Sequence, residues 1–241
     1  MKITVRYCKD CGTGAGGFQP GNTCAGGGGG GSSGGGGSSA GGGGGGDLFG
    51  NSLTAAADPS TPRATLAQLA KDESRWVRFE VAKNPVTPAE TLIELSKDDD
   101  GGVRSQVALS HSTPPTTLAE LSRDQATSVR SSVASNSNTP PDTLDELSTD
   151  DDWSVRSSVA SNSKTPPDTL DELSTDAFLS EAVASNPSTP RATLDALSED
   201  EDEEVREAVA SNYNTPRTTL AKLATDESKD VREAARRRLG R

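Results

Sequence analysis

The segment Asn136-Ser-Asn-Thr139-Pro140-Pro-Asp142-Thr-Leu144-Asp-Glu-Leu147-Ser-Thr-Asp150-Asp-Asp-Trp153-Ser-Val155-Arg156-Ser-Ser-Val159-Ala160 is one copy of a unit that the chain repeats seven times. The copies follow one another at steps of 26 residues, with one step of 24. Their Thr-Pro pairs begin at Thr61, Thr87, Thr113, Thr139, Thr165, Thr189 and Thr215. A fixed period of this length is typical of solenoids, in which each repeat packs against its neighbours.

The first half of each unit predicts a short helix that opens at the Thr-Pro pair. Thr is a preferred N-cap, and Pro at the first helical position loses no hydrogen bond. In three copies an acid three residues after the Thr predicts a capping box. Leucines spaced i, i+3, such as Leu144 and Leu147, mark the buried stripe.

The second half predicts another helix, with apolar residues spaced i, i+4, such as Val155 and Val159. In five copies an Asn follows this helix just before the next Thr-Pro pair. Because Asn tolerates the left-handed backbone conformation, we expect it to end the helix in that conformation.

The consensus V-R-x-x-V-A-x-N-P-x-T-P-x-x-T-L-x-x-L-S-x-D resembles the variant leucine-rich repeat family, and its Asp, Val-Arg and Ala positions are similar to those of HEAT-like repeats. This resemblance covers residues 58–241. It implies an all-α fold, a right-handed superhelical solenoid of seven two-helix repeats of about 26 residues each. It implies no reaction.

The charge of the chain limits its partners. The formal net charge is −12, and residues 58–241 hold 21 of the basic and 34 of the acidic residues. Such a field repels a nucleic-acid backbone or an anionic membrane. No apolar run is long enough to span a bilayer, and the N-terminus shows no apolar signal core, so we expect a cytoplasmic protein.

Residues 1–24 are predicted to form a separate element that contains all three cysteines: Cys8, Cys11 and Cys24. A short strand pattern precedes the Cys-x-x-Cys motif, whose spacing lets two thiolates reach one metal, either zinc or an iron–sulfur cluster. In the variant leucine-rich repeat family, members carry an N-terminal cysteine cluster with a 4Fe–4S centre. Here a fourth ligand would come from Asp10, water or a second chain. Reduced thiols without a metal, or a dithiol redox pair, remain alternatives.

Between this element and the repeats, residues 25–46 are almost entirely Gly, Ser and Ala, which predicts a flexible linker. Residues 47–57 align with a second helix of a repeat. We expect them to cover the exposed end of the first repeat as a cap, because a solenoid requires one.

Two polar positions recur through the repeats. Six arginines occupy one of them (Arg78, Arg104, Arg130, Arg156, Arg206 and Arg232) and seven aspartates the other. One interpretation places the arginines in a groove that binds phosphates or acidic peptides. The other pairs each Arg with an Asp of its own or the adjacent repeat. The acidity of the chain favours the pairing, and the substitution of Ser180 for Arg in the short fifth repeat should leave Asp176 short of a partner.

A band of acids is predicted on the first helices of repeats four to six. It consists of Asp145, Glu146, Asp171, Glu172 and Asp195. Such a band is either a solvated face or a site for a basic partner.

These observations favour a non-enzymatic protein–protein interaction scaffold whose partner is a protein or a basic peptide. The sequence offers no Ser/His/Asp or Cys/His set and no nucleotide-binding motif. One alternative is a metal or iron–sulfur protein with an electron-transfer or redox-sensing role through its cysteines. The other is a HEAT-like nucleic-acid-binding module, which would need the six arginines unpaired on a concave face.

Overall fold

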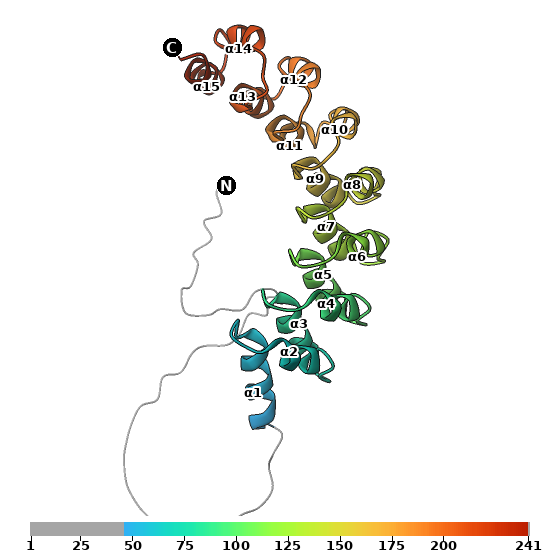
Figure 1. The fold of residues 1–241 in the computed structure, drawn as a ribbon. Helices are drawn as coiled ribbons and strands as arrows, with labels where there is room; N and C mark the ends of the chain where they lie inside the picture. The colour runs from blue at the N-terminus through green and yellow to red at the C-terminus, as the bar shows by residue number, and fades with distance from the viewer. Residues whose placement is uncertain (1–45, 241) are drawn as a thin grey trace, which may run out of the picture. The chain divides into compact units, whose positions relative to one another are not determined.

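The computed structural model describes residues 46–240, with side chains from residue 50 onward, and over that range its secondary structure is entirely helical. After α1 (Gly46–Ala57), seven helix pairs follow in chain order, and the predicted all-α solenoid is confirmed (Figure 1). The first helices of the pairs are α2 (Arg63–Leu69), α4 (Ala89–Leu95), α6 (Pro115–Leu121), α8 (Pro141–Leu147), α10 (Pro167–Leu173), α12 (Arg191–Leu197) and α14 (Arg217–Leu223). The second helices are α3 (Arg75–Lys83), α5 (Gly101–Leu109), α7 (Thr127–Ser135), α9 (Trp153–Ser161), α11 (Ser180–Ser185), α13 (Glu203–Ser211) and α15 (Lys229–Leu239).

The helices lie in two layers. Each odd-numbered helix packs against the odd-numbered helices before and after it, which makes one continuous layer. The even-numbered helices lie along one side of that layer, each against the second helix of its own repeat (Figure 1). Helix α1 packs against α3, and Ala56 is fully buried there. Within residues 46–240 no helix combines the length and apolar character that crossing a bilayer requires.

The core follows the predicted apolar stripes. In α8, Leu144 is fully buried and Leu147 nearly so, and in α9 Val155 and Val159 are fully buried. Burying one such side chain contributes about 1.5–3 kcal/mol. A helix of seven residues is too short to be stable alone in water, so this burial between repeats is what stabilises it.

The Thr of the Thr-Pro pair has a different role from the predicted one. The first helices begin after the Pro, and no side-chain cap is present at their N-termini, so the prediction of a Thr cap and a capping box is wrong. Instead the Thr hydroxyl donates backwards: Thr87 Oγ1 lies 2.6 Å from the carbonyl oxygen of Val81, and Thr113 Oγ1 lies 2.6 Å from that of Val107. These carbonyls also accept from a backbone N–H, that of Asn84 at 3.1 Å and that of Ser110 at 3.0 Å. The Thr therefore adds a second hydrogen bond at the C-terminus of the preceding helix and ties the turn to it.

The Asn after the second helix is also not left-handed. Asn162 has an extended backbone, with φ −78° and ψ 123°. Its side-chain amide Nδ2 donates to the carbonyl oxygens of Ala134 at 2.7 Å and Asn136 at 3.0 Å in the preceding repeat. The same pair of bonds to the preceding turn is made by Asn84, Asn136, Asn186 and Asn212. These asparagines form a ladder that joins consecutive repeats.

Candidate functional site

The recurring arginines and aspartates form a ladder of ion pairs along the loops that join first and second helices. Five of the six arginines reach the Asp twenty positions later, in the next repeat. The Arg Nε to Asp Oδ2 distance is 2.6 Å for Arg130 and Asp150, and Arg130 Nη2 lies 2.9 Å from Oδ1 of the same carboxylate. The other pairs are Arg78–Asp98, Arg104–Asp124, Arg156–Asp176 and Arg206–Asp226. The structural interpretation of the two positions is thus confirmed, and we call this array the Arg–Asp ladder.

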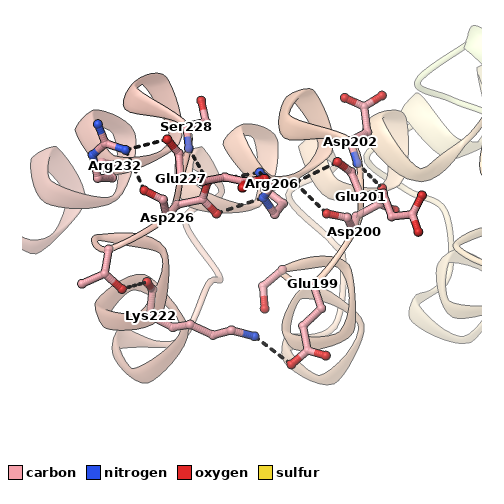
Figure 2. A network of polar contacts seen from close by, with 12 residues as sticks. Glu199, Asp200, Glu201, Asp202, Arg206, Lys222, Asp226, Glu227, Ser228 and Arg232 are labelled. Carbon is pink, nitrogen blue, oxygen red and sulfur yellow. Dashed lines mark hydrogen bonds and ion pairs between the residues drawn. The ribbon is translucent and has the colours of Figure 1, made fainter.

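Each ladder residue also holds the loop of its own repeat. Figure 2 shows Arg206 between two repeats: Nη1 donates to the carbonyl oxygen of Asp200 at 2.8 Å, while Nε donates to the carboxylate of Asp226 at 2.9 Å. The carboxylate of Asp226 in turn accepts from the backbone N–H of Ser228 at 2.8 Å. A guanidinium with these partners is occupied on both sides and has little capacity left for a phosphate.

The carboxylates of Asp98, Asp150 and Asp226 are held in their ionised form. The hydrogen bonds from Arg130 lower the pKa of Asp150 against the opposing effect of burial, and Arg206 lowers the pKa of Asp226 in the same way. For Asp98, burial is the largest influence and by itself raises the pKa, yet the bonds from Arg78 and from the N–H of Asp100 outweigh it, so that the pKa falls below its ordinary value. These three carboxylates are therefore ionised at neutral pH.

The interruption of the ladder lies one repeat later than predicted. Asp176 keeps a partner, with Arg156 Nη2 at 3.2 Å from its Oδ2, so the prediction that Asp176 would lack one is wrong. Ser180 takes the place of the Arg that would have reached Asp200, because each ladder Arg points to the following repeat. The Asp200 carboxylate keeps the bond from the N–H of Asp202 at 2.9 Å, as the paired aspartates do, but it makes no ion pair among the described residues.

The predicted acidic band is present as a row on the first helices. Asp145, Asp171 and Asp195 occupy equivalent exposed positions on α8, α10 and α12. Each accepts a hydrogen bond from the Thr hydroxyl of the next first helix: Thr169 to Asp145 at 2.6 Å, Thr193 to Asp171 at 2.6 Å, and Thr219 to Asp195. The Thr fixes one oxygen of each carboxylate, and the charge stays exposed to solvent.

The two glutamates of the band differ from one another. Glu146 is exposed and pairs with Arg123, whose Nη2 lies 3.0 Å from Oε2. Glu172 is exposed and makes no ion pair within residues 50–240. An exposed pair of this kind contributes little to stability, so Glu146 remains accessible to a competing cation.

The predicted metal ligands Cys8, Cys11 and Cys24 lie outside the described residues, and their role stays a prediction. In the part of the chain that the structure does describe, no group of His, Cys, Asp and Glu has the arrangement of a metal site. His111 lies exposed in the turn between α5 and α6.

One feature was missed at the sequence level. Trp153 at the start of α9 and Phe178 in the turn before α11 are exposed, at 64% and 91%, and together with Arg156 they line a cleft. A sequence signal existed: Phe178 lies two residues after the ladder Asp, where the other repeats carry Ser, Ala or Asp.

Comparison with known proteins agrees with this architecture. The sequence model of the family described as "Leucine rich repeat variant" matches residues 128–152. The chain is similar to a solved "leucine-rich repeat variant with a novel repetitive protein structural motif", with 27% identity, a TM-score of 0.54, and coverage of 78% of this chain and 80% of that one. A comparison with curated proteins gives no match.

Two further solved structures are similar at lower scores. A HEAT-like repeat protein from the archaeon Thermococcus onnurineus NA1 is 11% identical, with a TM-score of 0.34 and coverage of 78% of this chain and 89% of its own. An engineered protein is 18% identical, with a TM-score of 0.40 and coverage of 78% and 72%. Because both TM-scores lie below 0.5, nothing further follows from them.

Proposed function

We propose that this chain, which is built from variant leucine-rich repeats, is a non-enzymatic scaffold that binds a basic protein or peptide through its acidic row. Here the acidic row means Asp145, Asp171 and Asp195. The observation that carries the proposal is the regular spacing of these exposed carboxylates on α8, α10 and α12, each held in place by a Thr of the next repeat. A partner with basic side chains at a matching spacing would meet several fixed charges at once.

The electrostatics of the repeats support a basic partner over a nucleic acid. Five of the six ladder arginines are paired with an Asp of the next repeat. The sixth, Arg232, donates to the backbone carbonyls of Asp226 and Glu227. The nucleic-acid alternative requires these arginines to be unpaired, and an acidic chain gains no counterion release on a phosphate backbone.

The test is a binding titration with a dye-labelled peptide that alternates Arg and Ser, followed by fluorescence anisotropy. We expect the wild-type chain to bind it, with affinity falling as salt is raised, since exposed charges are screened. A peptide that alternates Glu and Ser and a short DNA duplex serve as comparisons and should not bind.

The variant Asp145→Asn/Asp171→Asn/Asp195→Asn removes three charges and keeps an oxygen that can accept from each Thr. With about 0.5 kcal/mol for each exposed pair, affinity should fall about tenfold. A matched control, Glu73→Gln/Asp99→Asn/Asp230→Asn, removes three exposed charges elsewhere and should change affinity less than about twofold. Equal losses in both variants would show that only net charge matters and that the row is no site.

A further inference from the structure

The cleft at Trp153 and Phe178 lies where the fifth repeat is two residues shorter than the others. Its volume is about 500 Å³, and Trp153, Arg156 and Phe178 line it. This volume lies in the range of pockets that take a ligand or a large side chain. Neither aromatic ring belongs to the core: Trp153 is 64% exposed and Phe178 is 91% exposed.

Phe178 replaces a residue that has a structural task elsewhere. In repeat four the equivalent residue is Asp152, whose carboxylate accepts from the N–H of Ser154 at 2.9 Å and so caps α9. Phe178 cannot accept such a bond, and α11 has only six residues and no side-chain cap. Helices α3, α7 and α15 also lack a side-chain cap, so the missing cap does not by itself distinguish α11. The exposure of the Phe178 ring to water does, and it disfavours a purely structural reason for a Phe here.

The two aromatic rings differ from those elsewhere on the surface. Trp76 is covered by the guanidinium of Arg75, at 4.5 Å from the ring centroid, and Tyr213 is covered by that of Arg238, at 4.4 Å. Those are the two Arg–ring contacts within residues 50–240, so neither Trp153 nor Phe178 has a cation over its face.

The charges around the cleft are suited to a cation. Arg156 lines it, but its Nη2 pairs with the carboxylate of Asp176 at 3.2 Å and its Nη1 donates to the carbonyl oxygens of Asp150 and Asp151. Asp151 and Asp152 immediately precede Trp153 in the chain, and Asp151 is exposed. The two segments that carry the rings, residues 150–156 and 176–178, hold four acids and one base, so their formal charge is negative.

We propose that this cleft binds an arginine side chain of a basic peptide, with the guanidinium stacked on Trp153 or Phe178 and an adjacent apolar residue in contact with the other ring. This inference rests on the proposed function, because it assigns a specific pocket to the basic partner. Arg suits the pocket better than Lys because its planar, weakly hydrated head stacks on aromatic faces.

The experiment uses the full chain with Trp76→Phe, which leaves Trp153 as its single tryptophan. The probe is a short peptide that alternates Arg and Leu, and the comparison is the same peptide with citrulline, an uncharged analogue, in place of Arg. We expect the Arg peptide to change Trp153 emission in a saturable way, and the citrulline peptide to bind about tenfold more weakly. Equal binding of the two peptides would overturn the assignment of a cation to the cleft.

Two variants separate this inference from the proposed function. Phe178→Ala removes an exposed ring. Trp153→Thr introduces the residue that repeat three has at this position, Thr127. Because this variant has no reporter tryptophan at the cleft, its binding is measured by fluorescence anisotropy of a labelled peptide. Each should weaken Arg-peptide binding about tenfold, whereas the control Tyr213→Ala, which removes an exposed ring from another repeat, should change it less than about twofold.

If the wild type binds the peptide and the cleft variants bind it equally well, the cleft is wrong and the proposed function stands. If the wild type binds no basic peptide, both are wrong. If the wild type is a dimer without peptide and Phe178→Ala makes it a monomer, the occupant is a second copy, and the peptide assignment is overturned.

Discussion

Asp150→Asn tests whether the Arg–Asp ladder holds the repeats together. Asp150 accepts two bonds from Arg130, and it accepts a third from the N–H of Asp152 at 2.9 Å. The side chains of Asp150 and Arg130 are 8% and 18% exposed, so the pair is largely shielded from water. Asn keeps one acceptor for the N–H of Asp152, but it loses the charge and turns an amide N–H₂ toward the guanidinium.

The expected cost follows from this geometry. Breaking a fully buried pair costs about 3–5 kcal/mol. Because the guanidinium is partly exposed and retains its bonds to the carbonyl oxygens of Asp124 and Gln125, we expect about 2–3 kcal/mol. In a chain of this size that corresponds to a fall in Tm of about 5–10 °C. The assay is thermal unfolding of the full chain at neutral pH, followed by far-ultraviolet circular dichroism.

Asp200→Asn is the matched control. Asp200 occupies the same position in the sixth repeat and accepts from the N–H of Asp202 at 2.9 Å, but Ser180 provides no Arg to pair with it. Its substitution should cost less than about 0.5 kcal/mol. If the two variants lose the same stability, the carboxylate acts only within its own loop, and the reasoning about pairing between repeats is refuted.

Three further predictions follow from the polar positions. The difference in unfolding free energy between wild type and Asp150→Asn should shrink as pH falls below 3.8, the ordinary pKa of an Asp. The pKa of Asp150 is lowered in the folded state, so the contribution of the ionised pair is lost when the carboxylate is protonated. A difference that stays constant from neutral pH to pH 3 would contradict this. Ser110 stands where five other repeats carry the Asn that donates to the preceding turn. Ser110→Asn should therefore raise the free energy of unfolding, measured in urea, by about 1 kcal/mol, and Asn84→Ser should lower it by a similar amount. Metal and sulfide analysis of protein purified without oxygen should find zinc or an iron–sulfur cluster. The metal should be lost when Cys8, Cys11 and Cys24 are replaced by Ala. Three freely titratable thiols without metal would contradict the prediction.

The sequence by itself determined the helix pairs and the core. The spacing of Leu144 and Leu147, and of Val155 and Val159, is a local property of each helix, and the structure buries these side chains as the spacing predicts. The repetition of the unit, with a period too short for an independent domain, required stacking of neighbours. The pairing of the arginines with aspartates could also be predicted from the sequence, because unpaired arginines are disfavoured on an acidic chain.

Only the tertiary structure decided which groups meet across repeats. Thr139 and Asn162 have strong local preferences, as an N-cap and for a left-handed turn. In the fold, however, Thr139 adds a second bond to the carbonyl of Val133, and Asn162 bonds the carbonyl of Ala134 in the preceding repeat. Which Asp loses its Arg depended on the direction of the Arg–Asp ladder, and the cleft depended on the approach of Trp153 and Phe178, 25 residues apart in the chain. Local periodicity specifies which face is buried, but hydrogen bonds and surface clefts depend on distances between repeats that only the packed chain defines.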